Sequence, residues 1–141
     1  MSSDAALRAI VAGGRLGVVA TLKRDGRPQL STVAYVSDPG ITLIRASVTD
    51  GRAKTANLRR DPRVSIHVAA NKGWSYAVAE GSAELGPVSA APGDATADEL
   101  VEIYRLQAGE HSDWDEFRAA MVADKRLVLR IHVERLYGLA R

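Results

Sequence analysis

The chain has 141 residues, which is enough for one domain with a single buried core. Hydrophobic residues make up 46% and charged residues 26%, a balance typical of soluble globular proteins, and no apolar run approaches the length of a membrane span. Because cysteine is absent, disulfides, thiolate metal sites and cysteine nucleophiles are excluded. The first residues lack the basic start and apolar core of a signal peptide, so we expect a cytoplasmic protein with no membrane partner.

The first part of the chain predicts a short helix and then a hairpin. Ser3 is a suitable N-cap for the helix, which a pair of glycines ends. Two apolar runs, residues 16–22 and 29–36, flank Asp25 and Gly26. This pattern predicts two antiparallel strands joined by a turn in which both central residues have positive φ.

The rest of the chain continues with strands and short helices. Trp74 opens a long strand that reaches Leu85, and the segment rich in Ala, Pro and Gly over 86–98 predicts a surface loop. Ser112 and Asp115 have the spacing of a capping box, which predicts the start of a helix. The other expected elements, in chain order, are a strand over 41–46, a short helix within 50–60, a strand over 64–69, a helix from about residue 100 to Gly109, and a strand over 127–134.

Six strands joined mostly by hairpins predict a mainly β, antiparallel barrel with helices at its rim, in one domain spanning 1–141. A barrel of this size is filled by its own side chains. A ligand site is therefore expected on the outer surface or between subunits.

The densest cationic stretch is RAKTANLRRDPR, residues 52–63. Arg52 and Lys54 fall in the first turn of the expected helix, where free backbone N–H groups and the helix dipole favour an anion. This arrangement indicates a phosphate or carboxylate clamp, because arginine offers a planar fork of donors and lysine a mobile charge. The alternative is an ordinary solvated helix face.

Polar and aromatic side chains on two strands are further candidates. Gln29 and Ser31 share one face of the second strand, with Thr32 on the other, and such groups can bind the edge of a heterocycle. The alternative is the wet face of a sheet. Trp74 and Tyr76 can stack on a planar ring, although aromatic residues at strand spacing also occur in cores and dimer interfaces.

Familiar catalytic motifs are missing. The three histidines lie far apart without metal-ligand spacing, and there is no Gly-x-Ser-x-Gly, Walker A or Gly-x-Gly-x-x-Gly pattern. We assign no catalytic residue and no metal ligand from the sequence. This result is compatible with an enzyme whose cofactor carries the chemistry.

Three segments together resemble a known family: GRPQLS at 26–31, RAKTANLRRDPR at 52–63 and WSYAVAEG at 74–81. They are similar to the pyridoxamine 5'-phosphate oxidase-like superfamily, and most of all to its actinobacterial F420-dependent members, the flavin/deazaflavin oxidoreductases of the B group. The similarity extends from about residue 14 to 138 and includes GEHSDW at 109–114.

The resemblance implies a six-stranded split β-barrel and a homodimer with two cofactor sites at the subunit interface. It also implies that the cofactor phosphate binds Arg52 and Lys54, helped by Ser47 and Asn57. The deazaflavin ring would lie near Gln29, Ser31 and Thr32, with Trp74 supplied by the other subunit. Relatives often carry Asn at the position of Thr32, so this chain lacks an amide there. The polyglutamyl tail of F420 would suit Arg59, Arg60 and Arg63.

The implied activity is transfer of a hydride from reduced coenzyme F420 to a small organic acceptor such as an unsaturated carbonyl compound, quinone or tetrapyrrole. One alternative is an FMN-dependent enzyme of the pyridoxamine phosphate oxidase type, since the same clamp suits FMN phosphate. A second is a non-catalytic carrier of F420 or FMN. Nucleic-acid binding through the cationic run is a third reading, and we expect no nucleic-acid partner because aromatic residues are scarce there.

Overall fold

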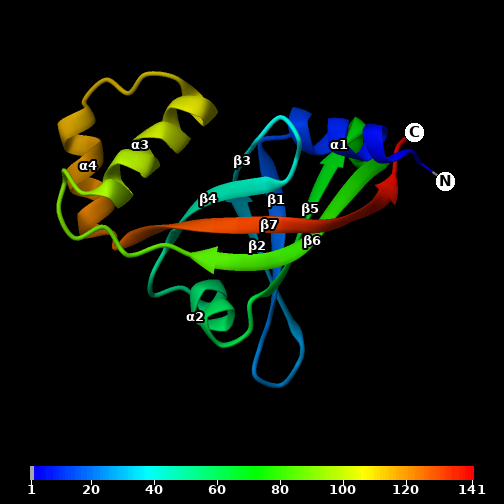
Figure 1. The fold of residues 1–141 in the computed structure, drawn as a ribbon, viewed down its shortest axis with the longest axis horizontal. Helices are drawn as coiled ribbons and strands as arrows, with labels where there is room; N and C mark the ends of the chain where they lie inside the picture. Colours follow the sequence, from blue (N-terminus) through cyan, green and yellow to red (C-terminus); the bar gives the residue numbers. More distant parts are fainter. Residues whose placement is uncertain (1) are drawn as a thin grey trace.

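A computed structural model describes residues 2–141, and its centre is one curled sheet of seven antiparallel strands (Figure 1). The strand order is β2-β1-β5-β6-β7-β4-β3, and β2 at one end curls into contact with β4 near the other. The elements are α1 (Asp4–Gly13), β1 (Leu16–Leu22), β2 (Pro28–Ala34), β3 (Val36–Ser37), β4 (Leu43–Thr49), α2 (Ala53–Arg60), β5 (Arg63–Ala70), the 3-10 turn η1 (Asn71–Gly73), β6 (Ser75–Leu85), α3 (Ala95–Ala108), α4 (Trp114–Ala123) and β7 (Arg126–Leu139).

This architecture confirms the predicted antiparallel split barrel, with seven strands instead of six. The extra strand arises because the run over 29–36 breaks at Tyr35, whose buried hydroxyl donates a hydrogen bond of 2.5 Å to the carbonyl of Val11 in α1. The bend at this tyrosine lets β2 pair with β1 and β3 pair with β4. The barrel interior is filled by side chains such as Val19, Ile66 and Leu129, all fully buried, as the sequence predicts.

Two turns differ from prediction, and local hydrogen bonds account for both. At the first hairpin only Gly26 has positive φ, at 85°, so the expectation of two such residues was wrong. Its N–H donates to the carbonyl of Lys23, which closes a longer loop that needs one left-handed residue. Before β4, the Asp38 carboxylate accepts hydrogen bonds from the N–H groups of Thr42 and Leu43, and the strand therefore starts later than predicted.

Helix boundaries follow capping chemistry. Ser3 caps α1 by accepting a hydrogen bond from a backbone N–H, as predicted, and Gly109 ends α3 with φ of 80°. The predicted capping box at Ser112 was wrong by one residue, because Asp113 caps α4 and accepts from the N–H of Glu116 at 3.1 Å. No helix within residues 2–141 has the length and apolar character needed to cross a membrane.

Helices α3 and α4 lie together at one end of the molecule, whereas α1 and both chain ends lie at the other (Figure 1). The two chain ends are joined by the Ser2 hydroxyl, which accepts a hydrogen bond of 2.6 Å from the N–H of Ala140. Helix α2 connects β4 to β5 and contacts β1 and β2.

The sheet face that points away from the barrel core carries several exposed apolar side chains, and we call it the outer face. One row of directly paired residues crosses five strands, in the order Thr32, Val18, His67, Val78 and Tyr137. Residues opposite each other in an antiparallel ladder share a face of the sheet. Exposed hydrophobic side chains next to this row belong to the same face, namely Leu16, Leu30 and Leu139.

Candidate functional site

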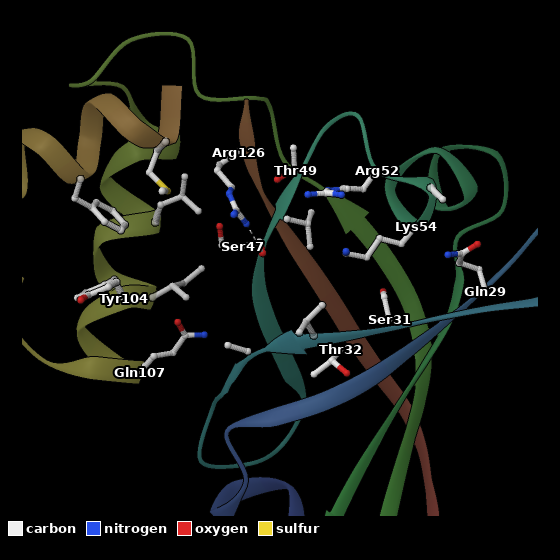
Figure 2. Close-up of a pocket in the computed structure, with 18 residues that line it drawn as sticks. Gln29, Ser31, Thr32, Ser47, Thr49, Arg52, Lys54, Tyr104, Gln107 and Arg126 are labelled. Atoms are coloured by element: carbon white, nitrogen blue, oxygen red, sulfur yellow. Dashed lines mark hydrogen bonds between the residues drawn. The ribbon is translucent and has the colours of Figure 1, made fainter. Parts of the chain in front are cut away.

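A pocket of about 700 Å³ opens between the sheet and the helices (Figure 2). One wall is polar and is formed by β2, β4, the start of α2 and the first residue of β7. The opposite wall is formed by α3 and α4. This volume lies within the range of small-molecule and cofactor sites. The polar wall contains Gln29, Ser31, Thr32, Ser47, Thr49, Arg52, Lys54 and Arg126.

Three cations meet in the pocket, Arg52 and Lys54 from α2 and Arg126 from β7 (Figure 2). Burial lowers the pKa of Lys54 below its ordinary value, and the positive charges of Arg52 and Arg126 lower it further. Like charges held this close repel one another unless an anion lies between them. Helix α2 adds to the positive field, because its first turn has no acidic residue and its N-cap side chain makes no capping hydrogen bond.

Two buried polar atoms in the pocket lack hydrogen-bond partners among residues 2–141. They are the Ser31 hydroxyl oxygen and the Nε of Arg126. The carboxylate of Asp124 lies 4.0 Å from this Nε, too far for a hydrogen bond, while another guanidinium nitrogen of Arg126 donates at 3.4 Å to the Ser47 carbonyl. Since native proteins satisfy most buried polar groups, we expect water or a polar ligand at these two atoms.

The structure brings six of the eight sequence-predicted binding residues into this pocket. Asn57 is not in the lining: it is buried, donates a 3.1 Å hydrogen bond to the Thr21 hydroxyl and accepts one from Arg60. Its side chain therefore anchors α2 to β1. Trp74 is also outside the lining, and its side chain is 69% exposed at the turn before β6. The residues in the pocket are Gln29, Ser31, Thr32, Ser47, Arg52 and Lys54.

The arginines later in the cationic run are engaged elsewhere. Arg59 pairs with Asp50 at 2.5 Å, and Arg63 pairs with Asp61 at 2.7 Å. Arg60 donates a 2.7 Å hydrogen bond to a backbone carbonyl at the end of β1. None of these three guanidinium groups lines the pocket.

Sequence reasoning missed Arg126 and the whole α3–α4 wall. Arg126 lies 72 positions after Lys54 in the sequence, and it reaches the pocket because β7 pairs with β4, where Thr49 is its direct partner. No local motif marks such a residue. The only available signal was the half-apolar pattern of the two helices, which is equally typical of a helix that packs on a core.

The histidines have contacts of their own outside the pocket lining. His67 stacks on Tyr76 on the outer face, with ring centroids 5.3 Å apart, and His132 binds Glu84 at 2.8 Å. His111 accepts a hydrogen bond from the N–H of Asp113. Within residues 2–141, no three His, Asp or Glu side chains form a group that could hold a metal ion.

The family model for pyridoxamine 5'-phosphate oxidase matches residues 3–140. This chain belongs to the pyridoxamine 5'-phosphate oxidase family. Membership places the protein in a class of flavin-type oxidoreductases and agrees with the split barrel.

Solved structures with the same fold include proteins of different stated function. A conserved hypothetical protein from Mycobacterium tuberculosis has a TM-score of 0.74 and 24% identity, over 99% of this chain and 86% of its own. An F420 reductase has a TM-score of 0.69 and 18% identity, over 92% and 94%. A FAD-binding protein from Mesorhizobium loti has a TM-score of 0.69 and 19% identity, over 97% and 94%. At these identities the similarity concerns the fold alone.

Proposed function

We propose that this protein is an F420-dependent oxidoreductase that transfers a hydride from reduced coenzyme F420 to a small organic acceptor. The observation that carries the proposal is the cluster of Arg52, Lys54 and Arg126 around a pocket in which Ser31 has an unpartnered hydroxyl. A phosphate group fits this site because it brings negative charge and several acceptor oxygens to donors that otherwise have no partner.

The residues present divide the binding task between two regions of the polar wall. Lys54, Arg52 and the first-turn N–H groups of α2 would hold the phosphate, and Arg126 would approach it from β7. Gln29 and Ser31, on β2, would donate to the polar edge of the deazaflavin, with Thr32 beside them at the rim of the pocket. When bound, the cofactor supplies a hydride from its reduced ring, and the protein supplies orientation and a positive field.

The choice of F420 over FMN rests on the three sequence segments that resemble the F420-dependent group. The occurrence of the same fold in an F420 reductase is compatible with this choice. An FMN-dependent oxidase of the pyridoxamine phosphate type would use the same phosphate clamp. A carrier without turnover would also bind either cofactor there.

We further propose that the protein acts as a homodimer that covers the outer face. The outer face exposes four large hydrophobic side chains, Leu16, Leu30, Tyr137 and Leu139. Exposed hydrophobic side chains that share one face of a sheet are typical of a protein–protein contact. Because Thr32 belongs both to this face and to the pocket rim, a second copy on the face would complete the site and bring its own Trp74 toward it.

The test of the proposed function is a paired titration of the purified protein with F420 and with FMN, followed by tryptophan quenching and then by turnover with hydride acceptors. Micromolar or tighter binding of F420 alone, with turnover, would support the proposal. Preference for FMN would favour the oxidase, and F420 binding without turnover of any acceptor would favour the carrier. Failure to bind either would refute all three.

The dimer is tested by Val18→Asp, which places a charge in the middle of the outer face. We expect the variant to elute as a monomer in size-exclusion chromatography with light scattering and to lose F420 affinity. The control Leu106→Asp, at an exposed position of α3, should change neither the oligomeric state nor the affinity. A monomeric variant that binds F420 as tightly as the natural protein would contradict an interface site.

A further inference from the structure

Helix α4 is joined to β7 by Asp124 and Lys125, and Lys125 has an unusual backbone conformation. Its φ is 53°, in the left-handed region that lysine seldom occupies. A left-handed residue ends many helices, and glycine is the usual residue there because it has no Cβ. The N–H of Lys125 donates a 3.1 Å hydrogen bond to the carbonyl of Val122 in α4. This turn lets β7 begin at Arg126, directly after the helix.

The point at which β7 begins decides where the Arg126 side chain lies. Arg126 pairs directly with Thr49 of β4, and both side chains line the pocket (Figure 2). Successive residues of a strand point to opposite faces, so the next residue, Leu127, is fully buried in the barrel core. A shift of one residue at the start of β7 would exchange these two side chains between pocket and core. The placement of Arg126 therefore depends on the turn before it.

The carbonyl of Lys125 is bonded to the segment that carries the other two cations. It accepts a 3.0 Å hydrogen bond from the N–H of Asp50, two residues before Arg52. The Thr49 carbonyl in the same segment accepts from the Arg52 N–H at 3.3 Å and from the buried Thr55 hydroxyl at 2.8 Å. These bonds fix the turn between β4 and α2, and the Lys125 carbonyl ties that turn to the start of β7.

The side chain of Lys125 lies apart from this arrangement. It is exposed and is not among the pocket-lining residues. The hydrogen bonds to Val122 and Asp50 use only backbone atoms of Lys125. A role of this residue in the pocket therefore belongs to its backbone conformation, and substitutions that differ in their preference for positive φ isolate that role.

We infer that Lys125 is a positioning residue whose left-handed backbone holds Arg126 beside Arg52 and Lys54. This inference rests on the proposed function, because it assigns the assembled cations to the cofactor phosphate. Like charges repel one another at short range, so the three cations would move apart in the ligand-free protein if the turn relaxed. Cations that are already assembled bind a phosphate with less reorganisation than cations that must first come together.

The ionisation of Lys54 reports whether the cations are assembled. Burial lowers the pKa of Lys54, and the positive charges of Arg52 and Arg126 lower it further. If Arg126 moves away, one of these causes is removed and the pKa of Lys54 rises toward its ordinary value. This measurement requires no cofactor.

The experiment compares Lys125→Val with Lys125→Gly and Lys125→Asn. All three remove the same charge, but valine is β-branched and disfavours positive φ, whereas glycine and asparagine adopt it readily. Lysine amines labelled by reductive ¹³C-methylation are titrated by NMR in the ligand-free protein. Only Lys23, Lys54 and Lys72 remain in each variant, and Lys54→Arg identifies the signal of Lys54.

The valine variant should differ from the other two in both cation placement and cofactor binding. We expect a higher pKa of Lys54 in Lys125→Val, because Arg126 is displaced there. The dissociation constant for F420 should be roughly fivefold higher in Lys125→Val than in Lys125→Gly, since a displaced guanidinium loses part of its attraction for the phosphate. The glycine and asparagine variants should agree within about twofold.

Lys72→Val is the matched control for the cost of the conformation itself. Lys72 is also exposed and has a φ of 58°, but it lies in η1 and outside the pocket lining. Valine at this position should lower the melting temperature, as it does at Lys125, and leave the pKa of Lys54 unchanged. If circular dichroism shows that Lys125→Val does not fold, Lys125→Ala takes its place, because alanine disfavours positive φ less strongly.

Three results would overturn the positioning role. They are equal pKa values of Lys54 in folded Lys125→Val and Lys125→Gly, equal changes in all three variants, which would assign the effect to the lost charge, and a raised pKa without loss of F420 affinity. Failure of the natural protein to bind F420 would instead refute the proposed function. The NMR titrations would still decide whether Lys125 positions Arg126.

Discussion

The two halves of the cationic run differ in what their side chains meet, although the sequence gives them the same charge. Arg52 and Lys54, at the start of α2, enter the pocket, where the positive charges of Arg52 and Arg126 act on Lys54. Arg59 and Arg63 each have an aspartate partner, and Arg60 binds a backbone carbonyl. Charge density therefore does not distinguish the two halves. Among residues 2–141, Arg52 and Lys54 differ from the later arginines because neither has a carboxylate partner, and we place the proposed phosphate site there for this reason.

The largest expected effect comes from Lys54→Ala, in the first of these halves. A charge-assisted hydrogen bond to phosphate contributes about 2 kcal/mol to the binding free energy, so we expect cofactor affinity to fall roughly 30-fold when it is lost. The unfolding transition should not move downward, because Lys54 is held next to two like charges in the ligand-free protein. Tryptophan quenching measures affinity, and Arg24→Ala, at the exposed hairpin tip, is the charge-matched control. Equal affinities for the two variants would contradict the clamp.

Arg126→Gln extends the comparison to a residue outside the cationic run. We expect about a tenfold loss of cofactor affinity, since glutamine removes the guanidinium charge and is too short to replace the nitrogen that donates to the Ser47 carbonyl. Calorimetric titration with F420 and with FMN measures the change. Unaltered affinity for both cofactors would show that Arg126 only supports the pocket wall.

The pH dependence of binding follows from the lowered pKa of Lys54. A phosphate stabilises the charged amine, so the pKa is higher in the complex than in the free protein. Affinity is therefore highest at pH values below the pKa of Lys54 in the ligand-free protein. It falls as the pH rises through that pKa, which lies below the ordinary lysine range. We expect a several-fold weaker Kd at about pH 10 than at about pH 7. Lys54→Arg should flatten this profile, because arginine stays charged.

The smallest effects are expected in the second half of the run. Arg59→Ala and Arg63→Ala should change cofactor affinity by less than about twofold, and because exposed ion pairs contribute little they should leave stability nearly unchanged. Titrations with F420 carrying short and long glutamyl tails sharpen the test. A loss of affinity confined to the long-tailed form would assign these arginines to the tail after all.

Much of the fold was predictable because local patterns determine it. Ser3 and Gly109 mark helix ends through capping chemistry, and strand periodicity indicates which residues fill the barrel. The errors have local physical causes of another kind. At Tyr35 a side chain turns into the core and breaks a strand. At Asp38 the carboxylate accepts hydrogen bonds from two backbone N–H groups, so that β4 begins later than predicted.

The polar wall was only partly predictable. Lys54 and Ser31 stand out in sequence by charge and strand position, but Arg126 reaches them only through the long-range pairing of β7 with β4. The opposite wall of the pocket, formed by α3 and α4, carries even less local signal, because Phe117 and Met121 have the same spacing as ordinary core residues. Only the placement of α4 beside an open pocket distinguishes them.

The hydrogen bond between Ser2 and Ala140 has a consequence for engineering. Since both chain ends lie on the side of the molecule away from α3 and α4, a short flexible linker could join them without crossing the pocket (Figure 1). New ends would then belong at the exposed tip of the β1–β2 hairpin, around Arg24 and Asp25. The resulting circular permutant would keep every helix and strand that lines the pocket. A protein fused to one of its new ends would lie next to β2, which forms part of the polar wall.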